Sequence, residues 1–133
     1  MRLIFTLSFI LVSYFGMSQN ISLIKKMKPE KEYSNIYVKK ISDDSLQTSF
    51  LIWVKKSVKN HYHAEHTENI YVLAGKAKMT IADSVLRIRK GDFLSIPKGV
   101  HHSVTKVFGR GPLKVLSIQA PKFTGADRVF VDE

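Results

Sequence analysis

Short runs of β-branched and aromatic residues, broken about every ten positions by turn-forming residues, constrain the fold of this chain most strongly. From Ile36 onward the runs are five to ten residues long. The breaks are rich in glycine, proline and aspartate and lie at 43–44, 75, 82–83, 91, 97–99 and 109–112. No run has the apolar spacing of a long amphipathic helix. The pattern predicts an all-β domain, a sandwich or a small barrel.

The first 18 residues differ from the rest of the chain and predict a secretory signal peptide. Arg2 gives a positive start, residues 3–14 are almost all apolar, and small residues precede Gln19. An uncleaved membrane anchor is the alternative, but about 15 apolar residues fall short of the roughly 20 that span a bilayer. We therefore expect export to the periplasm or the extracellular space. Cleavage would leave no membrane span and about 115 residues, enough for one domain.

Composition limits the chemistry and the partners. The chain has no cysteine, which excludes disulfides, thiolate catalysis and lipid attachment through a cysteine. Its net charge of +10 favours anionic surfaces or small anionic substrates. Six basic residues lie between Lys25 and Lys40 but carry no nucleic-acid motif, so they indicate a solvated basic face. We expect a small-molecule partner and no nucleic acid.

The predicted domain covers 36–133, and two segments indicate what packs against it. Residues 19–35 are expected to be an arm, either loose or with one helical turn. Residues 50–54 are apolar at five successive positions, so both faces of this strand should be covered. A single sandwich covers one face. The other face then packs against a second subunit, the arm or a loop, and among these we expect a homodimer.

All five histidines fall in two short segments, which points to a metal site. His61, His63 and His66 lie in the first segment, and His101 and His102 in the second. Imidazole is the commonest protein ligand for metals, and packing alone gives no reason to gather every histidine.

Strand geometry indicates how the first segment supplies ligands. His61 and His63 are two apart, so on a strand both imidazoles project from the same face. Four residues then turn the chain, and Glu68 opens the next strand with Ile70 and Val72 on its own face. The two imidazoles and the carboxylate can thus converge on one ion in front of an apolar lining.

The second segment supplies a fourth ligand. Gly91 turns the chain, residues 93–96 form a short strand, and residues 97–99 form a turn that places His102 at the start of another strand. His101 then faces away. Three imidazoles and one carboxylate suit a divalent transition metal, namely Fe, Mn, Ni, Zn, Co or Cu, and suit Ca or Mg poorly. In a six-coordinate ion they leave two positions open for substrate, dioxygen or water.

His66 is the one candidate catalytic residue outside the ligand set. It lies with Glu65 in the turn between His63 and Glu68, where either side chain can relay a proton or contact substrate at the rim. The alternative for both is a solvated turn residue.

These positions resemble the motifs of small single-domain cupins of the type-2 family. The first motif, two histidines separated by one residue, a glutamate and a glycine, is met by His61, His63, Glu68 and Gly75. The second motif, a glycine, a Pro-x-Gly turn and a histidine, is met by Gly91, Pro97, Gly99 and His102. Two flanking positions depart from the pattern, with lysine at 55 for glycine and at 106 for asparagine.

The resemblance implies a double-stranded β-helix, or small jelly-roll barrel, with the metal in its mouth. It implies no single reaction, because the fold is shared by dioxygenases, decarboxylases, isomerases, sugar binders and regulators. Two functions therefore stay open. The first is an exported metal-dependent enzyme acting on a small oxygenated substrate. The second is a non-catalytic module that binds a small molecule or the metal itself.

Overall fold

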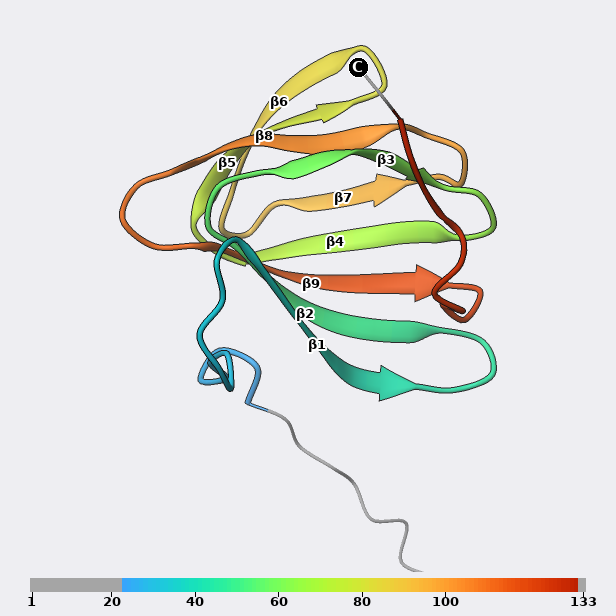
Figure 1. The fold of residues 1–133 in the computed structure, drawn as a ribbon, viewed down its shortest axis with the longest axis horizontal. Helices are drawn as coiled ribbons and strands as arrows, with labels where there is room; N and C mark the ends of the chain where they lie inside the picture. The colour runs from blue at the N-terminus through green and yellow to red at the C-terminus, as the bar shows by residue number, and fades with distance from the viewer. Residues whose placement is uncertain (1–22, 132–133) are drawn as a thin grey trace, which may run out of the picture.

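Two antiparallel sheets make up the chain, as the computed structural model of residues 23–131 shows (Figure 1). The described residues contain no helix, and the all-β prediction is confirmed. The predicted signal peptide lies outside the described residues. Within residues 23–131, no helical segment has the length and apolar character that crossing a membrane requires.

Ten strands follow one another within residues 23–131. They are β1 (Ile36–Asp43), β2 (Thr48–Val54), β3 (Val58–His63), β4 (Thr67–Ala74), β5 (Lys76–Ile81), β6 (Ser84–Arg89), β7 (Phe93–Ile96), β8 (His102–Phe108), β9 (Leu113–Ala120) and β10 (Arg128–Phe130).

The strands enter the two sheets almost alternately. One sheet has the order β1-β2-β9-β4-β7 and the other the order β10-β3-β8-β5-β6. From β2 to β5 each connection crosses to the opposite sheet, and the same holds from β6 to β10. Figure 1 shows the two sheets closing around a common interior. This winding is that of a double-stranded β-helix.

The core lies between the sheets and follows the predicted alternation. On β4, Ile70 and Val72 are buried with Glu68, whereas Tyr71 is 41% exposed. The alternation holds because successive side chains of a strand point to opposite faces, and one face of β4 meets the other sheet. Buried residues of both sheets complete the core, namely Val54, Ala77, Met79, Ile88, Ile96, Val104, Leu113 and Val115.

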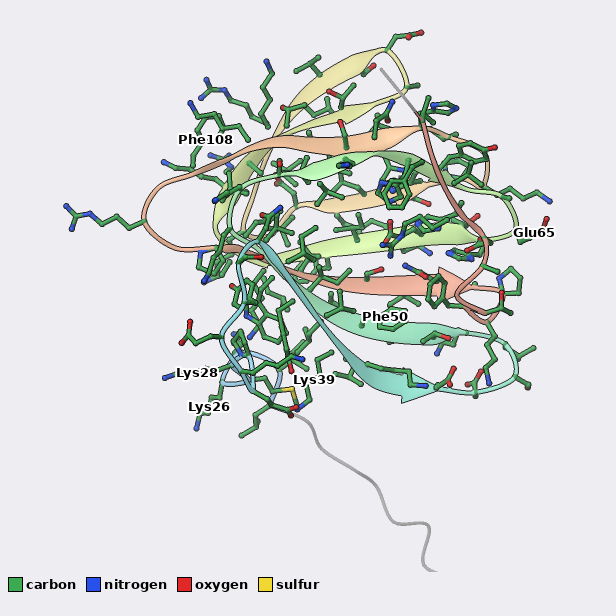
Figure 2. The ribbon with its side chains drawn as sticks, viewed as in Figure 1. Lys26, Lys28, Lys39, Phe50, Glu65 and Phe108 are labelled. Carbon is green, nitrogen blue, oxygen red and sulfur yellow. The ribbon has the colours of Figure 1, made fainter. Side chains whose placement is uncertain are left out.

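The N-terminal arm lies near Trp53, on the outer face of β2. Trp53 points outward and is only 3% exposed, because the ring of Tyr37 lies 5.6 Å from its own and the ammonium of Lys114 lies 5.1 Å away. Lys114 in turn donates hydrogen bonds to arm carbonyls, among them Met27 O at 2.8 Å. The arm lies beside β1 and β2, with Lys26 and Lys28 on it (Figures 1 and 2). A second subunit is therefore not needed to bury Trp53, and the homodimer stays a prediction.

Candidate metal centre

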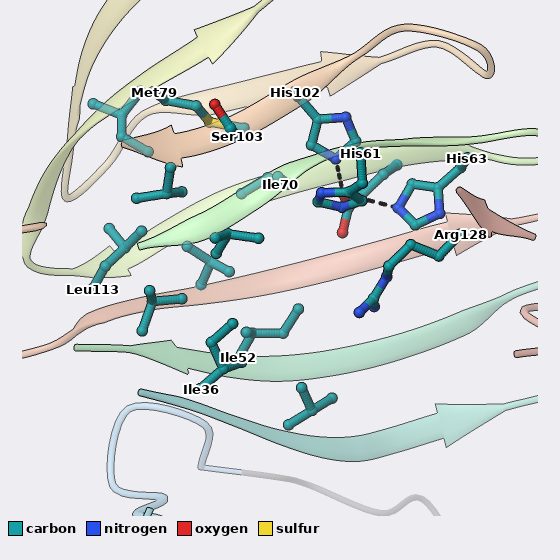
Figure 3. A pocket seen from close by; sticks show the side chains of 17 residues that line it. Ile36, Ile52, His61, His63, Ile70, Met79, His102, Ser103, Leu113 and Arg128 are labelled. Carbon is teal, nitrogen blue, oxygen red and sulfur yellow. Dashed lines mark ion pairs between the residues drawn. The ribbon is translucent and has the colours of Figure 1, made fainter. Parts of the chain in front are cut away.

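Four side chains from three strands meet at one end of the space between the sheets. His61 and His63 come from β3 and His102 from β8, and His61 is directly opposite His102 in the antiparallel register. Glu68 comes from β4, which belongs to the other sheet. The turn after His63 thus connects the two sheets, so the Glu68 carboxylate faces the three imidazoles from the opposite sheet. Figure 3 shows the imidazoles gathered, with the two ion pairs dashed.

The distances among these groups suit a single ion. Glu68 Oε2 lies 3.2 Å from His102 Nε2 and 3.6 Å from His63 Nε2. Each of His61, His63 and His102 offers a nitrogen within 4.8 Å of the other two. Ligands about 2.1 Å from one ion lie roughly 3–4 Å apart. The structure therefore brings together all four predicted ligands, and each is at most 5% exposed.

Backbone carbonyls fix the orientation of two of the imidazoles. His61 Nδ1 lies 2.8 Å from Lys59 O, and His102 Nδ1 lies 3.0 Å from Val100 O. A carbonyl can only accept, so each Nδ1 carries a proton, and in the neutral form of either ring Nε2 keeps its lone pair. His102 Nε2 is buried and has no hydrogen-bond partner among the described residues. Such an unsatisfied nitrogen beside a carboxylate fits a divalent transition metal.

Glu68 is held as an anion by its neighbours. Burial raises the pKa of its carboxyl, but the imidazoles of His102 and His63 and the hydroxyl of Ser117 outweigh burial and leave the pKa well below its usual range. Ser117 Oγ donates to Oε1, and Gln119 Nε2 donates to the same oxygen at 3.1 Å. With Oε1 engaged on β9, Oε2 is directed at the imidazoles.

His61 is kept neutral. Burial and the neighbouring imidazole of His102 lower its pKa from 6.5 to about 4. A neutral imidazole is the form that binds metals. His61 therefore needs no change of protonation at neutral pH to act as a ligand.

The same shift predicts how the metal-free protein responds to acid. The unfolded chain protonates His61 near pH 6.5 and the folded chain near 4, so the folded state binds fewer protons between these values. The protonation of His61 should leave the free energy of unfolding unchanged above pH 6.5 and lower it by about 3 kcal/mol as the pH drops to 4. Urea unfolding in the presence of a chelator measures this loss. His61→Gln should flatten the profile, and an equally steep profile in that variant would contradict the assignment.

A cavity of about 80 Å³ opens beside the four ligands. Most of its lining is apolar and comes from both sheets. The lining residues other than the four ligands are Ile36, Val38, Ile52, Val54, Val58, Ile70, Met79, Ile88, Ser103, Val104, Leu113, Val115 and Arg128. Apart from the ligands, Arg128 is the one charged residue in this lining, and Figure 3 shows it reaching inward below His63.

Four residues near the site were missed by sequence reasoning. Ser117 and Gln119 had a detectable signal, since they are polar at two inward positions of a strand whose other inward residues, Leu113 and Val115, are apolar. Asp127 and Arg128 had none, because they lie in a turn-rich tail whose position depends on pairing between β10 and β3. Arg128 pairs in register with His63.

The remaining candidates take different positions. His66 is only 2% exposed and does not line the cavity, since its ring stacks on that of His63 at 4.3 Å. Its catalytic role stays a prediction. Glu65 is exposed at the end of the barrel (Figure 2). His101 faces outward, as expected from the sequence, and stacks on Tyr62 at 5.0 Å.

Fold and site together define a double-stranded β-helix domain with a histidine-rich centre. Residues 49–119 match the cupin domain model, and the chain belongs to the cupin family. An uncharacterized protein of Aquifex aeolicus is 32% identical over 111 residues, covering 82% of this chain and 90% of that protein.

Two solved structures share the fold at low sequence identity. KdgF from Halomonas is 15% identical with a TM-score of 0.67, and the match covers 80% of this chain and 97% of that one. Pac13 from Streptomyces, a nucleoside dehydratase, is 14% identical with a TM-score of 0.58, and the match covers 71% and 84%.

Proposed function

We propose that this chain is an exported, metal-dependent cupin enzyme that acts on a small oxygenated, anionic substrate. The convergence of His61, His63, Glu68 and His102 beside a cavity carries the proposal. These four would hold one Fe, Mn, Ni, Zn, Co or Cu ion. When bound, such an ion acts as a Lewis acid or activates dioxygen. The range of reactions includes those of dioxygenases, decarboxylases and isomerases. Pac13 supports a catalytic role, since that similar fold houses an enzyme.

The cavity supports the substrate class. At about 80 Å³ it suits a molecule of a few carbon atoms, and its lining is mostly apolar. An anionic group on the substrate would pair with Arg128, since guanidinium matches a carboxylate in two parallel hydrogen bonds. The ligand end of the cavity would then receive the oxygenated end of the substrate, while the apolar walls exclude water.

Export and self-association belong to the same proposal. Residues 1–18 have the charge, apolar run and small residues of a cleavable signal peptide. N-terminal sequencing of the exported protein would find Gln19 first. Sedimentation of that mature protein would test the homodimer.

A non-catalytic binding module is the second candidate. One observation favours it: among the described residues that line the cavity, Arg128 is the one ionisable side chain besides the proposed ligands, and a guanidinium stays protonated. Catalysis would then depend on the metal centre and the substrate alone.

Two measurements test the proposal. Elemental analysis of protein purified without chelators or a histidine tag should find one transition metal per chain. Small carboxylic acids should then give metal-dependent product formation, or oxygen consumption under air that stops under argon. Tight binding without turnover would favour the binding module, and the absence of a stoichiometric metal would contradict both the enzyme and the metal-binding module.

Arg128→Gln should weaken binding of a small carboxylate about 10- to 100-fold, because a charge-assisted hydrogen-bond pair contributes roughly 1.5–3 kcal/mol. Calorimetry with a carboxylate that raises the melting temperature of the metal-loaded wild type measures the change. Arg87→Gln is the matched control, since Arg87 is exposed on β6 and does not line the cavity. Equal affinities of the two variants would remove Arg128 from the binding site.

A further inference from the structure

The C-terminal tail returns to the metal centre and buries one carboxylate behind it. After β9 the chain crosses to β3, where β10 pairs with the strand that carries His61 and His63. Ala64 N donates to Asp127 O at 3.0 Å, which fixes the tail at the end of β3. Asp127 is 7% exposed, although its neighbours Ala126 and Arg128 are exposed. The tail thus directs one acidic side chain inward.

The two oxygens of Asp127 face two different imidazoles. Oδ2 lies 2.6 Å from His66 Nδ1 and accepts from Glu65 N at 3.3 Å. Oδ1 lies 3.6 Å from His63 Nδ1. Both Oδ1 and His63 Nδ1 are buried, and neither has a hydrogen-bond partner in the described part of the chain. His63 Nδ1, a possible donor, and Asp127 Oδ1, an acceptor, therefore face each other at a distance just longer than a hydrogen bond.

His63 differs in this respect from the other two imidazole ligands. His61 and His102 each direct Nδ1 at a backbone carbonyl two residues earlier in the chain. His63 directs Nδ1 at a carboxylate from a distant segment. Imidazoles that bind a metal through one nitrogen donate the other N–H to a carbonyl or carboxylate, which fixes the ring and strengthens the ligand.

We propose that Asp127 is a positioning residue of the metal centre, whose Oδ1 accepts the Nδ1 proton of His63 and directs His63 Nε2 at the ion. This inference rests on the proposed metal site. His66 helps to fix the positions of both residues, because its ring stacks on that of His63 and its Nδ1 lies at hydrogen-bond distance from Asp127 Oδ2. In this proposal His66 acts on the ligand through Asp127.

His63, His66 and Asp127 offer ligand atoms within 4.8 Å of one another, close enough to hold an ion of their own, but the proposal treats them as a hydrogen-bonded group. Two ligands of one ion are roughly 3 Å or more apart. The 2.6 Å between His66 Nδ1 and Asp127 Oδ2 is instead the length of a short, charge-assisted hydrogen bond. Asp127 and His66 therefore bond to each other directly.

Zinc affinity of the Asp127→Asn variant tests the proposal. Competition against a chromophoric chelator should give an affinity about 10- to 100-fold below that of the wild type, as for other partners of metal-bound histidines. Asp83→Asn is the matched control, because Asp83 is exposed in the turn between β5 and β6 and should leave affinity unchanged. Equal affinities in Asp127→Asn and wild type would overturn the role of Asp127. A wild type that binds neither zinc nor Fe, Mn, Ni, Co or Cu would instead overturn the proposed function.

Nitrogen NMR of the zinc-loaded wild type tests the same point without a variant. The proposal expects His63 to bind through Nε2 and to show a slowly exchanging Nδ1 proton, shifted downfield by the carboxylate. In Asp127→Asn this proton should move upfield, while those of His61 and His102 stay in place. A general loss of folding would move all three. Coordination of His63 through Nδ1, or two zinc ions per chain, would overturn the proposal.

Discussion

Replacing His102 with alanine is expected to abolish stoichiometric metal binding. His102 Nε2 is buried, lacks a hydrogen-bond partner among the described residues and lies 3.2 Å from Glu68 Oε2. Removing a ligand should cost more than the roughly 10- to 100-fold expected for removing a residue that only orients one. Metal content after dialysis and zinc affinity by chelator competition measure the loss.

His101→Ala is the matched control for this variant. His101 is adjacent in sequence, but it is exposed and stacks on Tyr62 outside the barrel. This variant should keep its metal and its zinc affinity. The circular dichroism and melting temperature of both metal-free variants separate ligand loss from unfolding. Retained stoichiometric metal in a folded His102→Ala protein would show that the ion binds elsewhere.

Gly75→Ala is expected to destabilise the domain by about 2–5 kcal/mol. Gly75 turns the chain from β4 into β5 with φ at +82°, a conformation that costs an L-residue about 1–2 kcal/mol. A Cβ there would lie 2.7 Å from Pro112 O and 2.9 Å from Leu113 Cα, both backbone atoms. Such overpacking costs roughly 1–3 kcal/mol more. Urea unfolding of the metal-free protein measures the sum.

Gly109→Ala separates the two causes. Gly109 has φ at +91°, yet a Cβ built there meets nothing within 4 Å. Its substitution should therefore cost only the conformational part, about 1–2 kcal/mol. If the two variants lost the same stability, the contact of a Cβ at Gly75 with the backbone of Pro112 and Leu113 would not contribute to the destabilisation.

The sequence predicted those parts of the fold that depend on local signals. The alternation of Glu68, Ile70 and Val72 gave the buried face of β4, and residues 93–96 were correctly predicted as the strand β7. The tight turn at Gly75 also agrees with the structure. These features follow from a two-residue side-chain period and from turn residues with restricted backbones. Both act within a few positions of the chain.

The remaining features depend on contacts between distant segments. The sequence did not show that β3 and β4 belong to opposite sheets, because strand pairing is set by the whole barrel. His66 lies in a turn, where solvent exposure is common, yet it is buried because Asp127 arrives from 61 positions later. Likewise the arm shields Trp53 through Lys114, a contact between segments almost 90 residues apart.

Anomalous diffraction from crystals of the metal-bound protein, recorded at the absorption edge of its metal, tests the metal centre most directly. One peak per chain is expected, about 2.0–2.2 Å from Nε2 of His61, His63 and His102 and from Oε2 of Glu68. A metal-bearing crystal with no peak among these four side chains, or with their imidazoles turned away from it, would contradict the assignment.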